Sequence, residues 1–198
     1  HQRLSVIEPG LGGHQPMKNE NSTSWITTNS EIYNYQDLKD KLQTKYNFYS
    51  KSDTEVLLRS YDAWGLDCLE KLHGMFAFAI WDSLNGRLIL ARDRLGIKPL
   101  YYYSGKNILI FSSELRPILA TNLTKTNLNT SGIFQYLSFG RLGSPETILD
   151  PILELPPGHF LIADKNGIQI KEYWNPFKNK ESINPNIPIT KQIGQVLE

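Results

Sequence analysis

The chain has 198 residues, of which 40% are hydrophobic and 21% are charged, and its formal net charge is +1. This is the composition of a globular protein, and the length suits one domain or one domain with a tail. A near-zero charge argues against nucleic acid as a partner, and the longest apolar run, residues 75–81, is far too short to span a membrane. Because no secretory signal pattern opens the chain and a single cysteine cannot form an internal disulfide, we expect a cytoplasmic protein.

The first predicted elements are a strand and an amphipathic helix. Residues 25–29 are rich in bulky and β-branched types, which favours a strand. Residues 35–46 carry Leu38 and Leu42 four positions apart among charged residues, and this spacing is typical of a helix with one buried face.

A second helix is predicted to begin at Ser52. Ser52 and Glu55 have the spacing of a capping box, in which each side chain bonds the other residue's backbone N–H, and Gly65 is a suitable end. This places Asp53 in the first turn, where the N-terminal end of the helix dipole stabilises a carboxylate. An ionised Asp53 could then accept hydrogen bonds from an ammonium group.

The single cysteine, Cys68, lies in a third helical pattern. Apolar residues recur around it at three- and four-residue spacing over residues 66–72, which indicates the buried face of a helix. A buried cysteine behaves as a small hydrophobic residue, whereas a reactive thiolate needs an accessible and electropositive setting. We therefore interpret Cys68 as a core residue and not as a nucleophile.

The middle of the chain changes to a strand pattern. The predicted strands are residues 75–81, 87–92, 100–103 and 108–112. Asn85-Gly86 and residues 104–107 separate them as turn signals. These four runs predict an antiparallel meander of buried strands.

Helices, a hairpin and a linker follow. The predicted segments are helices 114–120 and 131–139, a hairpin of 159–163 with 168–173, a linker from Asn175 on, and the start of a last helix at 191–198. Pro117 is tolerated because it falls in the first turn of its helix. Helices grouped early and strands grouped later indicate a layered α+β fold.

Four polar residues, Arg3, Asn29, Glu31 and Asp53, could hold a free amino acid. The planar guanidinium of Arg3 suits an α-carboxylate, while Glu31 and Asp53 suit an α-ammonium. Each residue also has a plainer interpretation: Arg3 as a surface residue, Asn29 as a turn or cap residue, and the two carboxylates as residues that flank helices. No serine–histidine or cysteine–histidine arrangement accompanies them.

Other polar clusters favour structure over chemistry. Residues 92–94, Arg-Asp-Arg, form a charged turn between apolar strands, where arginine and aspartate satisfy backbone groups. His14, His73 and His159 stand apart from residues at metal-ligand spacing, so no metal site is indicated. The glycines of residues 10–13 lack the lysine and the helix of a phosphate-binding loop.

Seven stretches follow one another in the order and register of a known family. They are residues 13–17, 29–35, 52–56, 74–82, 91–102, 113–114 and 155–159. Together they resemble the glutaminase domain of asparagine synthetase, a class II glutamine amidotransferase. The likeness runs from His1 to about Pro176, and seven stretches in register are far more specific than one.

The resemblance implies an α+β fold, the four-layer αββα sandwich of the N-terminal-nucleophile hydrolases, with one or more N-terminal strands missing from this chain. It implies a glutamine amidotransferase type-2 domain over residues 1–175. Residues 176–198 would then be a linker and the start of a synthetase domain.

The implied activity is hydrolysis of glutamine, which supplies ammonia for ATP-dependent amidation of aspartate. The implied substrate-binding residues are Arg3, Asn29, Glu31 and Asp53, with Asn29 also in the oxyanion hole. The implied partners are L-glutamine and the synthetase domain of the same polypeptide, and a homodimer is allowed. The glutaminase domain needs no cofactor or metal, whereas ATP and magnesium belong to the synthetase domain.

Two features depart from the family pattern. The family's nucleophile is a cysteine at the very N-terminus, with its own α-amine as base, whereas this chain opens with His1, which matches a position inside the family's domain. The glycine beside the oxyanion-hole asparagine is here Ser30, and a Cβ is costly there if the backbone needs a positive φ or a close approach to substrate. We therefore expect the 198-residue chain to be inactive by itself. The alternative is a non-catalytic scaffold module, as in β-lactam synthetases.

Overall fold

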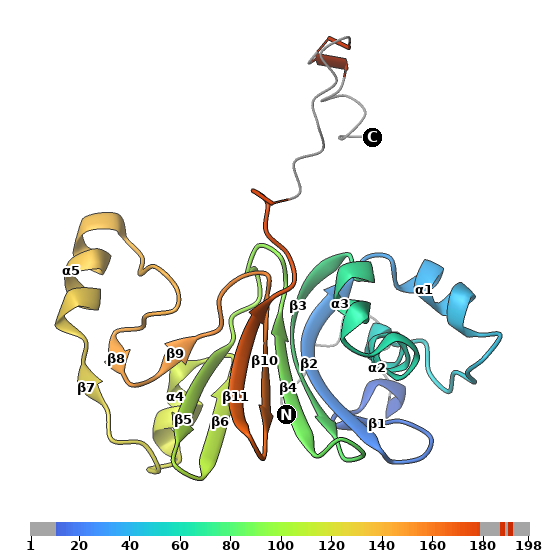
Figure 1. Cartoon of the computed structure of the whole chain (residues 1–198), viewed down its shortest axis with the longest axis horizontal. Helices are drawn as coiled ribbons and strands as arrows, with labels where there is room; N and C mark the ends of the chain where they lie inside the picture. Colours follow the sequence, from blue (N-terminus) through green and yellow to red (C-terminus); the bar gives the residue numbers. More distant parts are fainter. Residues whose placement is uncertain (1–10, 179–186, 189, 192–198) are drawn as a thin grey trace.

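The largest sheet draws its strands from both ends of the chain (Figure 1). The computed structural model describes residues 11–178, 187–188 and 190–191. Six antiparallel strands make this sheet, in the order β1 (Met17–Lys18), β2 (Ser24–Ile32), β3 (Gly74–Asp82), β4 (Arg87–Arg92), β10 (His159–Asp164) and β11 (Gly167–Glu172). The predicted strands at 25–29, 75–81 and 87–92 and the predicted C-terminal hairpin are confirmed.

A second sheet holds β6 (Ile108–Ser112), β5 (Tyr101–Gly105) and β9 (Leu153–Glu154), in that order. The prediction of one continuous meander is therefore wrong. Its first two strands, β3 and β4, belong to the six-stranded sheet, and its last two, β5 and β6, belong to the smaller one. The chain crosses from one sheet to the other between Arg92 and Tyr101.

The turn after β4 explains this crossing. The buried carboxylate of Asp93 accepts four main-chain hydrogen bonds, from the N–H groups of Phe76, Leu95, Ile97 and Lys98. The guanidinium of Arg92 donates to the carbonyls of Gly96, Lys98 and Leu155 and pairs with Glu154 at 2.9 Å. Because Glu154 and Leu155 belong to and follow β9, Arg92 ties the two sheets together. The structural interpretation of residues 92–94 is confirmed for these two side chains.

Helices cover one face of the six-stranded sheet. They are α1 (Tyr35–Leu42), α2 (Asp53–Trp64) and α3 (Cys68–Lys71), with the 3-10 turns η1 (Leu11–Gly13) before β1 and η2 (Gly65–Asp67) between α2 and α3. α1 ends four residues earlier than predicted, because Leu42 is its last buried residue and exposed polar residues follow. The helix predicted over 66–72 is divided between η2 and α3. α4 (Leu115–Ala120) packs against β5 and β6 of the second sheet.

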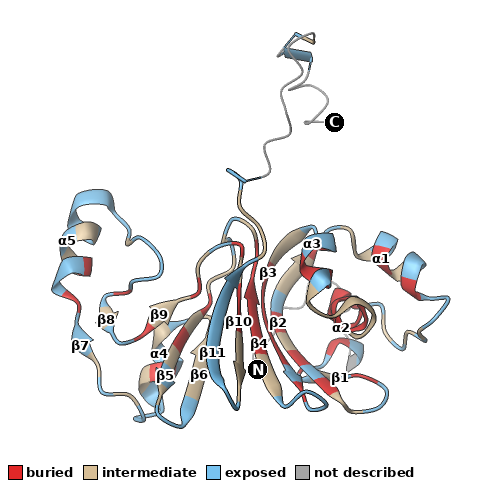
Figure 2. Ribbon diagram, viewed as in Figure 1, coloured by how far each residue is buried: buried red, intermediate tan, exposed pale blue. Residues whose placement is uncertain are grey.

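Two apolar clusters define the layers, as the buried residues in Figure 2 show. Alternate residues of β3 point to opposite faces, as strand geometry requires. Phe76, Phe78 and Ile80 belong to the cluster between the helices and the larger sheet, whereas Ala77 and Ala79 belong to the cluster between the two sheets. The order helix, sheet, sheet, helix is the αββα sandwich that the resemblance implied.

The remaining elements form an arm that stands away from both sheets (Figure 1). Strands β7 (Asn127–Leu128) and β8 (Leu149–Asp150) pair at its base and α5 (Thr130–Phe139) stands above them. The side chain of Asn129 caps α5 by accepting from the N–H of Gly132, and the helix ends at Gly140 with φ 73°. The helix predicted at 131–139 is confirmed.

Candidate functional site

Strand β2 presents Asn29 and Glu31 on one face. Ile26, Thr28 and Ile32 are buried on the opposite face, whereas Asn29 is exposed and Glu31 half-buried. Residues two apart on a strand lie about 7 Å apart on the same side. The carboxamide and the carboxylate therefore lie next to each other, as a shared substrate site requires.

Asp53 meets the end of this strand. It is the first residue of α2, is 5% exposed, and its Oδ2 accepts a hydrogen bond from the main-chain N–H of Ile32 at 3.2 Å. Ile32 directly follows Glu31, so this hydrogen bond ties the first turn of α2 to the end of the strand that carries Asn29 and Glu31. A single amino-acid site formed by Asn29, Glu31 and Asp53 stays a prediction.

The start of α2 is fixed differently from the prediction. The Oγ of Ser52 does accept from the N–H of Thr54 at 3.2 Å, which confirms Ser52 as the N-cap. The reciprocal half of the capping box is wrong, because the carboxylate of Glu55 accepts from the N–H groups of Tyr49 and Ser50 instead. Glu55 therefore holds the loop before the helix rather than the cap itself.

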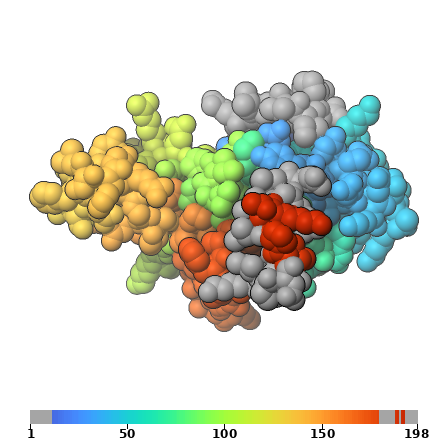
Figure 3. Space-filling view, turned by 90° about the horizontal axis from the view of Figure 1, so that it is seen from above, coloured from blue at the N-terminus to red at the C-terminus, as the bar shows by residue number. Residues whose placement is uncertain are grey.

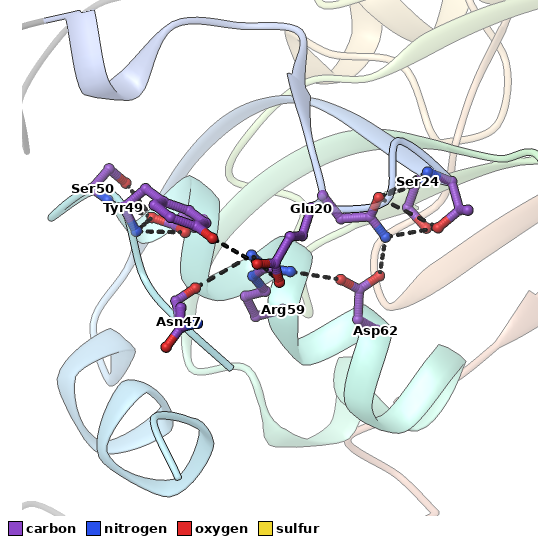
Figure 4. A network of polar contacts seen from close by, with 10 residues as sticks. Glu20, Ser24, Asn47, Tyr49, Ser50, Arg59 and Asp62 are labelled. Atoms are coloured by element: carbon purple, nitrogen blue, oxygen red, sulfur yellow. Dashed lines mark hydrogen bonds and ion pairs between the residues drawn. The ribbon is translucent and has the colours of Figure 1, made fainter. Parts of the chain in front are cut away.

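A buried arginine fixes the other side of α2 (Figure 4). Arg59 is 4% exposed, lies 3.6 Å from Asp62 and 3.9 Å from Glu20, and donates to the carbonyl of Asn47. Tyr49 donates its hydroxyl to Glu20 at 2.6 Å. Burial raises the pKa of Asp62, although Arg59 opposes the shift. This network joins three segments around α2 and so supports the position of its first turn.

Gly74 allows β2 to end against β3 at close range. A Cβ on Gly74 would lie 2.2 Å from the carbonyl oxygen of Glu31 and 2.9 Å from the Cα of Ile32, and its φ is +150°. Both conditions exclude a larger residue. The backbone that carries Glu31 therefore depends on this glycine, which sequence reasoning placed in a motif without assigning it a role.

Gln15 is a second residue whose role sequence reasoning missed. It is buried, and its Oε1 accepts from the main-chain N–H of Thr28 at 2.6 Å, beside Asn29. Its Nε2 donates to the Oγ1 of Thr54 at 3.4 Å, in the first turn of α2. Gln15 therefore links β2 to α2 next to the candidate site, and its place in the stretch 13–17 was the signal that could have identified it.

Ser30 does not strain the backbone. It lies within β2 opposite Phe76, and it is absent from the described non-glycine residues with positive φ, which are Ser22 and Asn122. By strand alternation its side chain points away from the face that holds Asn29. The predicted cost of a positive φ does not arise at this position, and the predicted cost of a close approach to substrate stays a prediction.

The other predictions concern Arg3, Cys68, metal binding and membrane spans. Arg3 lies outside the described residues. Cys68 is 1% exposed, and burial raises its pKa to about 12, which confirms it as a core residue. Among the described residues no group of His, Cys, Asp and Glu could hold a metal ion. In the same part of the chain, each helix is too short or too polar to cross a bilayer.

Comparisons with known proteins identify the family of the chain. Residues 1–174 match the family described as glutamine amidotransferase domain. The chain is similar to glutamine-hydrolysing asparagine synthetase 3 of Bacillus subtilis strain 168, with 39% identity over 186 residues, covering 92% of this chain and 30% of that protein. It is also similar to asparagine synthetase 1 of the same organism, with 38% identity over 175 residues, covering 87% of this chain and 27% of that protein.

A solved structure shares the fold. Glutamine phosphoribosylpyrophosphate amidotransferase from B. subtilis superimposes with a TM-score of 0.59 at 21% identity, covering 88% of this chain and 34% of that chain. At this identity the likeness shows the fold alone. The chain spans 30% or less of the length of the two asparagine synthetases.

Proposed function

Because the chain belongs to the glutamine amidotransferase domain family, we propose that it is the glutaminase domain of an asparagine-synthetase-like amidotransferase. Its role is to bind L-glutamine and release ammonia for ATP-dependent amidation of aspartate. ATP and magnesium act, in this proposal, in a synthetase domain of the same polypeptide. One observation carries the proposal: the carboxylate of Asp53, on α2, accepts a hydrogen bond from the N–H of Ile32, the last residue of the strand that carries Asn29 and Glu31.

Each residue has a role that follows from its chemistry. Asp53 and Glu31 are acceptors for the α-ammonium of glutamine, and Arg3 is a bidentate donor to its α-carboxylate. The side-chain N–H of Asn29 donates to the oxyanion that forms when a thiolate attacks the amide carbon. The amide nitrogen then leaves as ammonia, and water hydrolyses the thioester to glutamate.

The nucleophile is not Cys68, because this thiol is buried and its pKa is raised. Cys68 is the single cysteine of the sequence. We therefore propose that the 198 residues bind glutamine without hydrolysing it, and that a polypeptide with an N-terminal cysteine completes the reaction.

The alternative is a non-catalytic scaffold role, which Ser30 in place of glycine favours. Ser30 itself lies in regular strand geometry, opposite Phe76 of β3. Glutamine binding separates the two roles, because a scaffold needs no intact substrate site.

Calorimetry with L-glutamine tests the proposal on the parent chain and on Asp53→Asn. The asparagine retains an oxygen that can accept from Ile32 but carries no charge for the ammonium. We expect Asp53→Asn to weaken binding by about 1–3 kcal/mol, the value of a hydrogen bond to a charged group.

Asp37→Asn is the matched control, since Asp37 is an exposed aspartate in the first turn of the neighbouring helix α1. It should bind glutamine like the parent. Equal affinities of the parent and Asp53→Asn, with unchanged melting temperatures, would remove Asp53 from the site. No binding of glutamine by a polypeptide with an N-terminal cysteine would overturn the proposed function.

A further inference from the structure

Helix α5 exposes an unusual amount of apolar surface. Its ten residues include no charged side chain, and Phe134, Tyr136, Leu137 and Phe139 are 72%, 54%, 75% and 79% exposed. Leu128, on β7 at the base of the arm, is 66% exposed. We call these five residues the α5 patch. Single exposed hydrophobic residues are normal, but a contiguous apolar group of this kind marks an interaction surface.

The patch covers much of the helix surface, but not all of it. Successive residues of a helix are about 100° apart around its axis, so the four apolar side chains leave a polar sector that holds Ser131, Gln135 and Ser138. Gly132 faces Leu142 of the arm itself. The exposed apolar side chains therefore form a surface that a partner can cover.

The arm is ordered largely by its own contacts, and the carbonyl of Pro145 also accepts a hydrogen bond from the N–H of Glu154 in β9 at 2.8 Å. A Cβ on Gly132 would lie 2.7 Å from the side chain of Leu142, so α5 packs closely on the segment that follows it. The Nδ2 of Asn129 donates to the carbonyl of Thr147 at 3.1 Å. Figure 3 shows the residues of the arm, in yellow and orange, at one end of the molecule, beyond the green strands. Within the described residues the exposed side chains of the patch therefore have no covering layer.

We propose that the α5 patch docks into an apolar groove of the synthetase domain that follows in the same polypeptide. The identity of this domain rests on the proposed function. The asparagine synthetases that match are more than three times as long as the matched region, since the chain covers 30% and 27% of them. In Figure 1 the chain leaves β11 at the upper end of the sheets, and α5 stands at that same end.

The experiment compares hydrogen exchange of the α5 amides in the 198-residue chain and in the polypeptide encoded by the complete reading frame. We expect the α5 amides to exchange at least about tenfold more slowly in the complete polypeptide, because docking suppresses local opening. In the complete polypeptide, Leu137→Asp should abolish this protection. The variant should still hydrolyse glutamine, but its glutamine-dependent formation of asparagine should fall.

Leu84→Asp is the matched control, because Leu84 is 77% exposed and Leu137 is 75% exposed. It should leave the exchange of α5 unchanged. Both variants should melt like the parent in the 198-residue chain, since neither side chain is buried.

Three results would overturn the inference: equal exchange of α5 in both polypeptides, a reading frame without a synthetase domain, or a dimer of the 198-residue chain that Leu137→Asp dissociates. Glutamine hydrolysis is measured separately on the same samples. If the α5 amides are protected but glutamine is not hydrolysed, the docking is supported and the proposed function is contradicted. If glutamine is hydrolysed but the α5 amides are not protected, the proposed function is supported and the docking is contradicted.

Discussion

The carboxylate of Asp53 accepts a hydrogen bond from the main-chain N–H of Ile32 at 3.2 Å, and this contact joins the first turn of α2 to the last residue of β2. It fixes the buried carboxylate of Asp53 at the end of the strand that carries Asn29 and Glu31. The contact depends on three supports that come from different parts of the chain: the Ser52 cap, Gln15 and Gly74. The candidate substrate site is therefore a property of the packed helix and strand together.

Gly74→Ala should be strongly destabilising. The new Cβ would lie 2.2 Å from the carbonyl oxygen of Glu31, at a φ of +150°. We expect a loss of about 2–4 kcal/mol in the free energy of unfolding, measured by urea denaturation. Gly86→Ala is the control, because Gly86 has φ +59° and nothing within 4 Å of its added Cβ. Gly86→Ala should lower the free energy of unfolding by about 1–2 kcal/mol. Equal losses for the two variants would show that the backbone around Gly74 moves to accommodate the new Cβ at no extra cost.

Asp93→Ala should cost even more than most core substitutions. Removal of this buried carboxylate leaves four main-chain N–H groups without their acceptor. We expect a loss of at least about 3 kcal/mol in the free energy of unfolding, because buried unsatisfied donors are expensive. Asp37→Ala, at an exposed first-turn position, should cost less than about 1 kcal/mol. A small effect of Asp93→Ala would mean that water replaces the carboxylate in the turn.

Stability should fall in alkaline solution through Tyr61. Burial raises the pKa of Tyr61, and the hydrogen bond that its hydroxyl donates to Asp82 adds to this effect. Because the pKa in the folded state lies above the ordinary value of 10.0, the stabilisation is complete below pH 10 and is lost as the pH rises above it. We expect the melting temperature to decline with pH above about 10, and to decline less steeply in Tyr61→Phe. Parallel declines in both proteins would assign the effect to other groups.

Cys68 should be inert toward thiol reagents in the folded chain. Burial raises its pKa to about 12, so almost no thiolate exists at pH 8, and the sulfur is inaccessible. We expect one thiol to react with a disulfide reagent in denaturant and none in its absence. Rapid reaction of the native chain at pH 8 would reopen the question of Cys68 as a nucleophile.

Ser30→Gly should not improve the substrate site. The serine side chain lies on the face of β2 opposite Asn29, so its removal creates no space beside Asn29. We expect glutamine affinity to equal that of the parent in calorimetry. The free energy of unfolding should fall by roughly 0.5–1 kcal/mol because glycine weakens a strand. An increase in affinity would show that Ser30 obstructs the site.

Local sequence patterns predicted most helices and strands. They failed where contacts between distant residues determine which sheet a strand joins. The alternation of residues 25–29 and the runs 75–81 and 87–92 identified three strands of the larger sheet, because one face of a strand must be apolar to be buried. The meander was wrong because a sequence does not show which sheet a strand joins. The carboxylate of Asp93 and the guanidinium of Arg92 redirect the chain through contacts with residues up to 63 positions away.

The sequence by itself determined the family, since seven stretches in register are specific, and it determined which residue types are available for an amino acid substrate. Packing between elements set which of them lie close together: it brings Asp53 to Ile32 at the end of β2, and it turns Ser30 to the opposite face from Asn29. It also makes Glu55 hold a loop rather than a cap, and it leaves the apolar side chains of α5 uncovered by the other described residues. The physical reason is that helix and strand periods are local, whereas the geometry of a site depends on packing between elements that are far apart in the chain.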